Sequence, residues 1–371
     1  MKKMFCLLLS LAMVLSLAAC GGDSGAKDSG SSAPSDSGSS APSDSGSSDS
    51  GSSFKDETLV VGVWGGTIEA VLRESVVDPM EEEYGCNIEL VLGGTSERKA
   101  KMYAEVDNPS MDVLFLNIYE SKQAIDDGVA QEVDSSLSNF GSLYDFAQTG
   151  GYGMSIMGLG ICYNNEQVAT PITSWKDLWR PELKGKVALS TMPGFENDAF
   201  IALTAQTWGL DLATQEDEVF KKIAELGPFP LFYNDLDELF LEMKQGVVLA
   251  AAIFNSYSND YIEQGFPVSF VYPTDPGSIL AKDTIVIAKN TAHEALAKEF
   301  VNRCIGVDAQ TAYAESIFFS PCNKDVKVAD DVAKKLVYGD DVNTLVSLDW
   351  DYILEHEDAW TDQFNRMVEG N

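Results

Sequence analysis

The sequence predicts an α/β protein with two lobes. Three buried-strand patterns, at residues 59–63, 87–92 and 112–116, each lead through a short polar loop into a helix pattern. Such β-loop-α units with short loops are typical of a parallel sheet. A second series begins with a strand pattern at 186–190, and a strand at 283–288 returns to the first series. This order predicts two lobes, with the chain passing from the first lobe to the second and then back again.

The first strand ends at a candidate binding site. Its Val-rich pattern at 59–63 is followed by Trp64, Gly65 and Gly66, and then by a helix pattern. The two glycines allow a sharp turn and leave space for a ligand, and Thr67 is predicted to cap the helix. Ligands of open α/β sheets bind beyond the carboxyl ends of the strands. Trp64 is therefore predicted to stack on a ligand.

The later elements follow from apolar periodicity and turn residues. A long apolar, Gly-rich run at 152–163 is predicted to be a strand that crosses between the lobes. Further strands are predicted at 247–254 and 268–272, and helices at 97–106, 193–208, 236–245, 292–304 and 308–316, with Gly85 ending the first helix and Pro193 in a first helical turn. The predicted domain bounds are 58–155 with 277–371 for the first lobe and 156–276 for the second.

The N-terminal part of the chain is predicted to be a targeting and anchoring segment rather than a folded domain. Residues 1–19 have the charged start and short apolar run of a signal peptide. Leu17-Ala18-Ala19-Cys20 resembles the lipobox of bacterial lipoproteins, which implies cleavage before Cys20 and lipid on its thiol. The Ser-, Gly- and Asp-rich residues 20–57 are predicted to be a disordered linker. An extracytoplasmic protein is expected, tethered by lipid to the cell membrane on its outer face or in the periplasm.

Charge and composition exclude several classes of function. The net charge of −33 argues against nucleic acid as a partner. The chain has only two histidines and no CxxC spacing, so no metal site and no cofactor are expected. No GxSxG motif is present, and an enzyme is not expected. The four cysteines after Cys20 are compatible with disulfides or with buried free thiols.

Two more strands of the first lobe end in polar or aromatic side chains. Thr95 and Ser96 follow the second strand, and Asn117 and Tyr119 follow the third. Because the carboxyl ends of parallel strands meet at one sheet edge, these residues are predicted to lie beside Trp64. The edge therefore carries the candidate site.

Several motifs in a fixed order resemble extracellular solute-binding proteins of bacterial ABC importers. They are Val-Trp-Gly-Gly-Thr at 63–67, Thr-Ser-Glu-Arg-Lys at 95–99, Ser-Trp-Lys-Asp-Leu-Trp at 174–179 and Glu-Leu-Lys-Gly-Lys-Val-Ala-Leu at 182–189. The branch most similar is that of the spermidine/putrescine-binding proteins. The resemblance implies a two-lobed periplasmic-binding-protein-like fold (type II), with two crossover strands as hinge and a ligand cleft between the lobes that closes on its ligand. It also implies an ABC importer permease as partner, and a monomer is expected.

The same resemblance assigns cleft residues to the second lobe. They are Ser190, Thr191, Asn255, Ser256, Tyr257, Tyr272 and Asp275. An aromatic box formed by Trp64, Tyr119, Tyr257 and Tyr272 would suit a polyamine or a related amine. However, polyamine binders tend to carry acids where this chain has Gly65-Gly66 and Asn255-Ser256.

An anionic ligand is the alternative. Thr67, Ser96, Ser190 and Thr191 lie at predicted helix N-termini, where backbone N–H groups bind phosphate or carboxylate. An organic phosphate, phosphonate or carboxylate is therefore a second possibility for the same receptor role. An exported enzyme and a sensory surface protein are more distant alternatives.

Overall fold

The structure is a computed structural model that describes residues 54–370. The predicted signal peptide, the lipid site Cys20 and the linker up to residue 53 lie outside the described residues. Within 54–370, none of the helices combines the length and the apolar character needed to cross a membrane.

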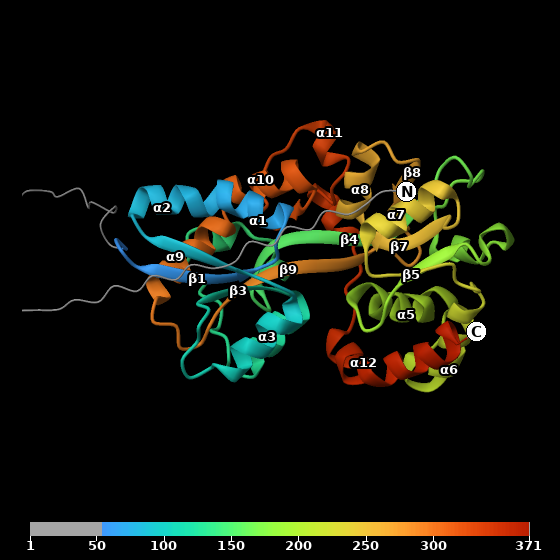
Figure 1. Ribbon diagram of the computed structural model, residues 1–371, viewed down its shortest axis with the longest axis horizontal. Helices are drawn as coiled ribbons and strands as arrows, with labels where there is room; N and C mark the ends of the chain where they lie inside the picture. Colours follow the sequence, from blue (N-terminus) through green and yellow to red (C-terminus); the bar gives the residue numbers. More distant parts are fainter. Residues whose placement is uncertain (1–53, 371) are drawn as a thin grey trace, which may run out of the picture. The chain divides into compact units, whose positions relative to one another are not determined.

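The first lobe is built on three parallel strands, as the β-loop-α pattern predicts. Strand β1 (Thr58–Val63) pairs in parallel with β2 (Asn87–Leu92) on one side and with β3 (Val113–Asn117) on the other. Figure 1 shows α1 and α2 on one face of these strands and α3 on the other. The helices are α1 (Thr67–Leu72), which continues through the π-helical η2 (Arg73–Val77) into α2 (Asp78–Tyr84), α3 (Thr95–Ala104) and α4 (Ile118–Asp126).

Glycines set both ends of the first helical segment. Gly85 follows α2 in the left-handed conformation, with φ of 67°, and so ends the helix as predicted. At the other end the prediction for Thr67 is wrong, because Gly66 is the N-cap and no side chain caps the helix. Gly66 takes a φ of 74°, a turn conformation that leaves Thr67 as the first helical residue.

Two long antiparallel strands connect the lobes. Strand β9 (Ile279–Ile287) pairs with β3 on one side and with the first part of β4 (Tyr152–Asn164) on the other. The second part of β4 pairs instead with β7 (Ala250–Phe254) and β8 (Val268–Val271). These two strands run side by side through the middle of Figure 1 and are the crossover strands that the fold class predicts.

The second lobe repeats the parallel arrangement. Strand β5 (Val187–Ser190) pairs in parallel with β7 and with β6 (Phe232–Tyr233), which completes the sheet order β2-β1-β3-β9-β4-β7-β5-β6. Its helices are α5 (Phe195–Trp208), α6 (Leu212–Ala224), α7 (Leu236–Gln245) and α8 (Asn255–Glu263). Pro193 precedes α5 rather than lying in its first turn, since the helix starts at Phe195. Short turns of 3-10 helix lie at Phe140–Ser142, Asp145–Gln148, Trp175–Trp179, Pro181–Leu183 and Gly339–Thr344.

The C-terminal part of the chain contacts both lobes. Helices α9 (Glu294–Cys304) and α10 (Val307–Ile317) cover the first lobe, followed by β10 (Ser320–Pro321) and α11 (Asp330–Ala333). Helix α12 (Trp350–Phe364) and the π-helical η8 (Asn365–Glu369) then pack beside α5 and α6 of the second lobe (Figure 1). There the Nε2 of Gln363 donates to the Oδ1 of Asp217 at 2.7 Å.

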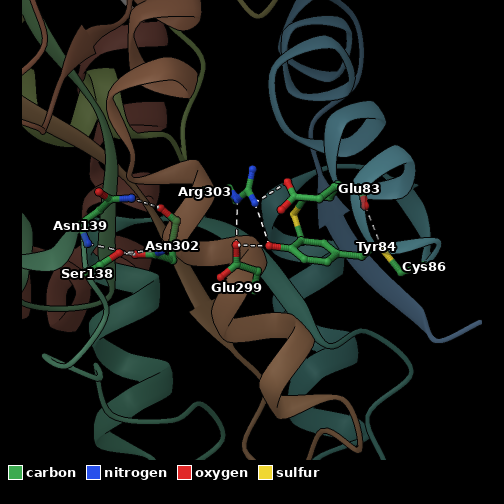
Figure 2. Close-up of polar contacts among 9 residues, drawn as sticks. Glu83, Tyr84, Cys86, Ser138, Asn139, Glu299, Asn302 and Arg303 are labelled. Carbon is green, nitrogen blue, oxygen red and sulfur yellow. Dashed lines mark hydrogen bonds and ion pairs between the residues drawn. The ribbon is translucent and has the colours of Figure 1, made fainter. Parts of the chain in front are cut away.

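One ionic cluster holds α9 against α2. The guanidinium of Arg303 contacts Glu299 at 2.8 Å and Glu83 at 2.7 Å, and it donates to the hydroxyl of Tyr84 at 2.8 Å (Figure 2). Nearby, Cys86 is a buried free thiol, as are Cys162, Cys304 and Cys322, so none of these four cysteines forms a disulfide in the structure.

Close contact at a glycine of the crossover strand gives a stability prediction. A Cβ at Gly160 would lie 2.5 Å from the Phe270 ring and against the Val271 carbonyl oxygen. We therefore expect Gly160→Ala to lower the free energy of unfolding by about 1 to 3 kcal/mol, measured by urea denaturation. Gly141→Ala is the control, because a Cβ at Gly141 meets no atom within 4 Å. Equal stability of the two variants would contradict the prediction.

Candidate functional site

A cavity of about 360 Å³, here called the main cavity, lies where the two lobes and the crossover strands meet. The first lobe supplies the residues that follow β1 and β3 and the start of α3. The second lobe supplies the start of α5 and the end of β7. The lining residues are Trp64, Ile68, Thr95, Asn117, Met157, Phe195, Glu196, Phe254, Tyr257, Ala281, Lys282, Asp283 and Phe319.

The indole of Trp64 is fixed in the wall of the main cavity. Its Nε1 donates to the hydroxyl of Thr95 at 3.0 Å. The guanidinium of Arg98 lies 4.7 Å from the ring centroid, and Phe115 makes an edge contact at 6.4 Å. The ring is therefore oriented by its neighbours before any ligand arrives, which favours binding because little side-chain entropy remains to be lost.

Two buried cations close to the cavity are bound to backbone carbonyls. Arg98 donates to the carbonyl oxygens of Gly93 and Phe115, and burial lowers its pKa to about 10. Lys282 is 1% exposed, and its Nζ donates to the carbonyl oxygens of Phe146 and Thr149, each at 2.7 Å. Burial lowers the pKa of Lys282 to about 8. The hydrogen-bond donors of both side chains are therefore at least partly used by backbone carbonyl oxygens of the protein itself.

Two carboxyl groups line the main cavity. Asp283 projects from β9, and its Oδ2 accepts a hydrogen bond from the hydroxyl of Ser155 at 2.8 Å. Burial raises the pKa of Asp283 to about 6, while the Ser155 bond and the charge of Arg98 act in the opposite direction. Glu196 lies in the first turn of α5, and burial also raises its pKa. Asp283 is therefore ionised at neutral pH, in a place poor in water.

Four of the residues expected from the sequence line the main cavity, namely Trp64, Thr95, Asn117 and Tyr257. Ser190 and Thr191 line a second pocket, here called the linking pocket, which shares Glu196 and Tyr257 with the main cavity. Ser96 and Tyr119 line a third pocket next to α12, here called the α12 pocket. The linking pocket and the α12 pocket share Pro193 and Gly194. The three spaces thus adjoin one another along residues 190–196.

The other expected residues lie elsewhere. Gly65 and Gly66 are exposed in the turn after β1, Thr67 is exposed at the start of α1, and Asp275 is exposed after β8. Three more residues make contacts inside the protein. Asn255 accepts a hydrogen bond from the Gly158 N–H at 2.9 Å, Ser256 contacts the sulfur of Met157, and Tyr272 lines a separate cavity.

Several lining residues were not anticipated from the sequence. The sequence predicts Asp283 only as the first residue of a strand, and its signal is a lone acid ahead of an apolar run. Glu196 and Phe195 follow Gly194 at the start of a helix, as Thr95 follows Gly94. Phe254 was assigned to a buried strand, and it is the last residue of that strand.

The fold defines the class of protein. Two α/β lobes on two crossover strands are the architecture of the two-lobed periplasmic binding proteins. A solved ABC transporter protein from Clostridium perfringens shares it with a TM-score of 0.73 and 29% identity, over 84% of this chain and 99% of that one. MotA from A. tumefaciens B6, solved in complex with glucopine, has a TM-score of 0.69 and 17% identity, over 84% and 99% of the two chains.

Sequence comparison gives the family. Residues 75–337 match the bacterial extracellular solute-binding protein family, and the chain belongs to it. The spermidine/putrescine-binding periplasmic protein of Escherichia coli is 22% identical over 275 residues, which cover 70% of this chain and 78% of that protein. The spermidine/putrescine-binding periplasmic protein 1 of Haemophilus influenzae is 24% identical over 275 residues, covering 69% and 74%. The protein is thus a solute-binding receptor.

The raised pKa of Asp283 gives a prediction for stability. Because its folded pKa of about 6 lies above the ordinary value of 3.8, the stabilisation from its protonated form is full below about pH 4 and is lost as the pH rises through about 6. The Asp283→Asn variant has no carboxyl group to ionise at this position, so it avoids this decrease in the free energy of unfolding. We expect the stability of the variant relative to the wild type to increase from pH 4 to pH 8 by on the order of 1 to 2 kcal/mol.

Thermal denaturation of the ligand-free proteins at the two pH values measures this difference. Asp145→Asn is the matched control, since Asp145 is an exposed acid that does not line the main cavity. A stability difference between Asp283→Asn and wild type that is the same at both pH values would refute the assignment.

Proposed function

We propose that the protein captures a polyamine or a related organic amine outside the cytoplasm and delivers it to an ABC importer. One observation carries this proposal: the carboxyl groups of Asp283 and Glu196 line the same cavity as five aromatic rings. The rings belong to Trp64, Phe195, Phe254, Tyr257 and Phe319.

This set of groups fits an ammonium ion on an aliphatic chain. A buried ammonium loses its hydration and needs a carboxylate with hydrogen-bonding capacity in return. Asp283 provides it, because within residues 54–370 its carboxylate accepts a side-chain hydrogen bond only from Ser155 and so keeps further acceptor capacity. Aromatic faces add cation–π attraction of about 0.5 to 2 kcal/mol each. They also provide apolar surface for the methylene groups of such a ligand.

The names of the relatives support the same ligand class. Both the Escherichia coli and the Haemophilus influenzae relatives are named as spermidine/putrescine-binding proteins. In the sequence, the absence of acids at Gly65-Gly66 and Asn255-Ser256 argues against an amine ligand. Asp283 and Glu196 remove that objection, because they bring carboxylates to the cavity from other positions of the chain.

The proposed role includes the tether. The Leu17-Ala18-Ala19-Cys20 motif would place lipid on Cys20, and the Ser-rich residues after it would give the receptor reach to its permease. Lipidation of this kind keeps a soluble receptor at the membrane that holds the importer.

One observation favours the anionic alternative. Helices α3 and α5 start at the main cavity, and their N-caps, Gly94 and Gly194, provide no side-chain hydrogen bond to the helix. Free N–H groups at such helix starts bind carboxylate or phosphate. An organic carboxylate, phosphate or phosphonate is therefore the second candidate, and a binding screen separates it from an amine.

Isothermal titration calorimetry with spermidine, putrescine, citrate and glycerol phosphate tests the proposal. We expect the two amines to bind and Asp283→Asn to weaken their binding by about 10- to 100-fold, because the variant leaves the ammonium without its counter-charge. Asp260→Asn, an exposed acid of α8, is the control and should bind as the wild type does. Binding of the anions alone would establish the second candidate instead.

The pH dependence of amine binding provides a separate prediction. The pKa of Asp283 is raised to about 6, so its carboxyl group is protonated below this value and no longer attracts a cation. We expect the Kd for n-butylamine, which carries a single ammonium, to rise as the pH falls below 6, approaching about tenfold per pH unit. The Kd of Asp283→Asn should change much less over the same range. A wild-type Kd that stays constant from pH 7 to pH 5 would exclude Asp283 as the counter-charge.

A further inference from the structure

The α12 pocket has a volume of about 400 Å³ and lies between the two lobes and helix α12. Tyr119 and Glu120 line it from α4, Gly194 from the start of α5, and Glu357 from α12. Through the linking pocket it adjoins the main cavity along residues 190–196. No group of three His, Cys, Asp or Glu side chains within residues 54–370 has the arrangement of a metal site.

Glu120 is a buried acid whose carboxylate is only partly paired. The residue is 6% exposed, and its Oε2 meets no hydrogen-bond donor among the described residues. Burial raises its pKa, and the charges of Lys99 and Arg98 on α3 oppose this change. Lys99 also lines the α12 pocket, but its Nζ donates to the Oε1 of Gln123 at 2.6 Å. An oxygen of Glu120 is thus available to a cation.

Asp198 is a second buried acid in the same region. It is 2% exposed in α5, and its Oδ1 has no partner within the described part of the chain. Burial raises its pKa to about 8. The charge of Glu357 on α12 and a side-chain hydrogen bond with Glu357 raise it further, as does the charge of Glu196, while a hydrogen bond from the Gly194 N–H lowers it. Asp198 is therefore largely protonated at neutral pH when the protein is empty.

Helix α12 is held over this pocket by aromatic stacking. The ring of Trp350, at the start of the helix, lies 5.3 Å from Tyr119 of the first lobe and 4.4 Å from Phe195 of the second. Glu357 follows two turns later in the same helix, which Figure 1 shows alongside α5. The pocket is thus a space enclosed by both lobes and by α12.

We infer that the α12 pocket is a second cation subsite, in which Glu120 and Glu357 bind another ammonium group of the same ligand and Asp198 supports Glu357 through their hydrogen bond. This inference rests on the proposed function, because the first ammonium would lie at Asp283. It specifies the ligand as an amine with at least two positive charges, which separates polyamines from monoamines. A protonated amine provides both the charge and the N–H donors that the unpaired oxygen of Glu120 lacks.

Binding at this subsite releases a proton. When a positive charge enters beside Glu357, the ionised form of the hydrogen-bonded Asp198–Glu357 pair is favoured, and the proton that Asp198 holds at neutral pH passes to the buffer. A monoamine that occupies only the main cavity does not reach this carboxyl group. Proton release is therefore specific to the second charge of the ligand.

Calorimetry with putrescine and n-butylamine, which differ by one amino group, tests the inference. At pH 7 we expect putrescine to bind at least about tenfold more tightly than butylamine. The heat of binding in Tris and in phosphate should differ for putrescine, as proton release requires, and should differ much less for butylamine. Glu120→Gln and Glu357→Gln should reduce the preference for putrescine by about tenfold. Glu355→Gln, an exposed acid of α12, should not change it.

The outcomes separate this inference from the proposed function. If putrescine and butylamine bind equally, both depend on Asp283, and neither releases protons, the amine receptor stands and the second subsite is wrong. A preference for putrescine that survives in both Glu120→Gln and Glu357→Gln also overturns it. If no amine binds the wild type, both proposals fail. Circular dichroism of each variant confirms folding, and Glu357, which is only half-buried, gives a variant with little risk to the fold.

Discussion

The structure depends on the antiparallel pairing of β4 with β9. All 13 residues of β4 are buried, and the strand exchanges its partner from β9 to β7 and β8 along its length. Glycines make this exchange possible, since a Cβ at Gly158 would lie 2.8 Å from the Tyr272 ring. The main cavity lies directly on this pair, because Met157 of β4 and Asp283 of β9 form part of its lining. The strands that join the lobes therefore also carry residues of the proposed binding site.

The buried cationic and acidic groups near the main cavity differ in how well their hydrogen bonds are satisfied. Lys282 has two backbone carbonyls as partners, so its charge is compensated within the empty protein. Asp283, Glu120 and Asp198 have few partners, and burial raises the pKa of each. Groups buried with unmet hydrogen bonds destabilise the empty protein, and a cation that binds them restores this free energy. The asymmetry between satisfied cations and unsatisfied acids is the physical basis for proposing a positively charged ligand.

Much of the fold could be predicted from the sequence because its elements are locally encoded. The Val-rich run before Gly65-Gly66 predicted β1, the apolar run at 112–116 predicted β3, and Gly85 ends the first helical segment in the left-handed conformation. The binding groups were harder to predict, since Asp283 and Glu196 are brought together by pairings between strands far apart in sequence. Asn255 illustrates the opposite error. It follows a strand, as cleft residues do, but its amide supports the backbone of β4.

Helix α12 contacts both lobes and carries Glu357, so a motion of the lobes would change both its packing and the spacing of the acidic side chains around it. Sequence alone groups residues 277–371 with the first lobe, but α12 packs on α5 and α6, and Trp350 stacks on rings from both lobes. A hinge motion about β4 and β9 would change the distance between Tyr119 and Phe195, and the Trp350 contacts would have to rearrange with it. Because Glu120 directly follows Tyr119 and Glu196 directly follows Phe195, the same motion would also move carboxyl groups relative to one another. The charge of Glu357 on α12 raises the pKa of both Glu120 and Asp198, and a cation placed between Glu120 and Glu357 would remove this repulsion.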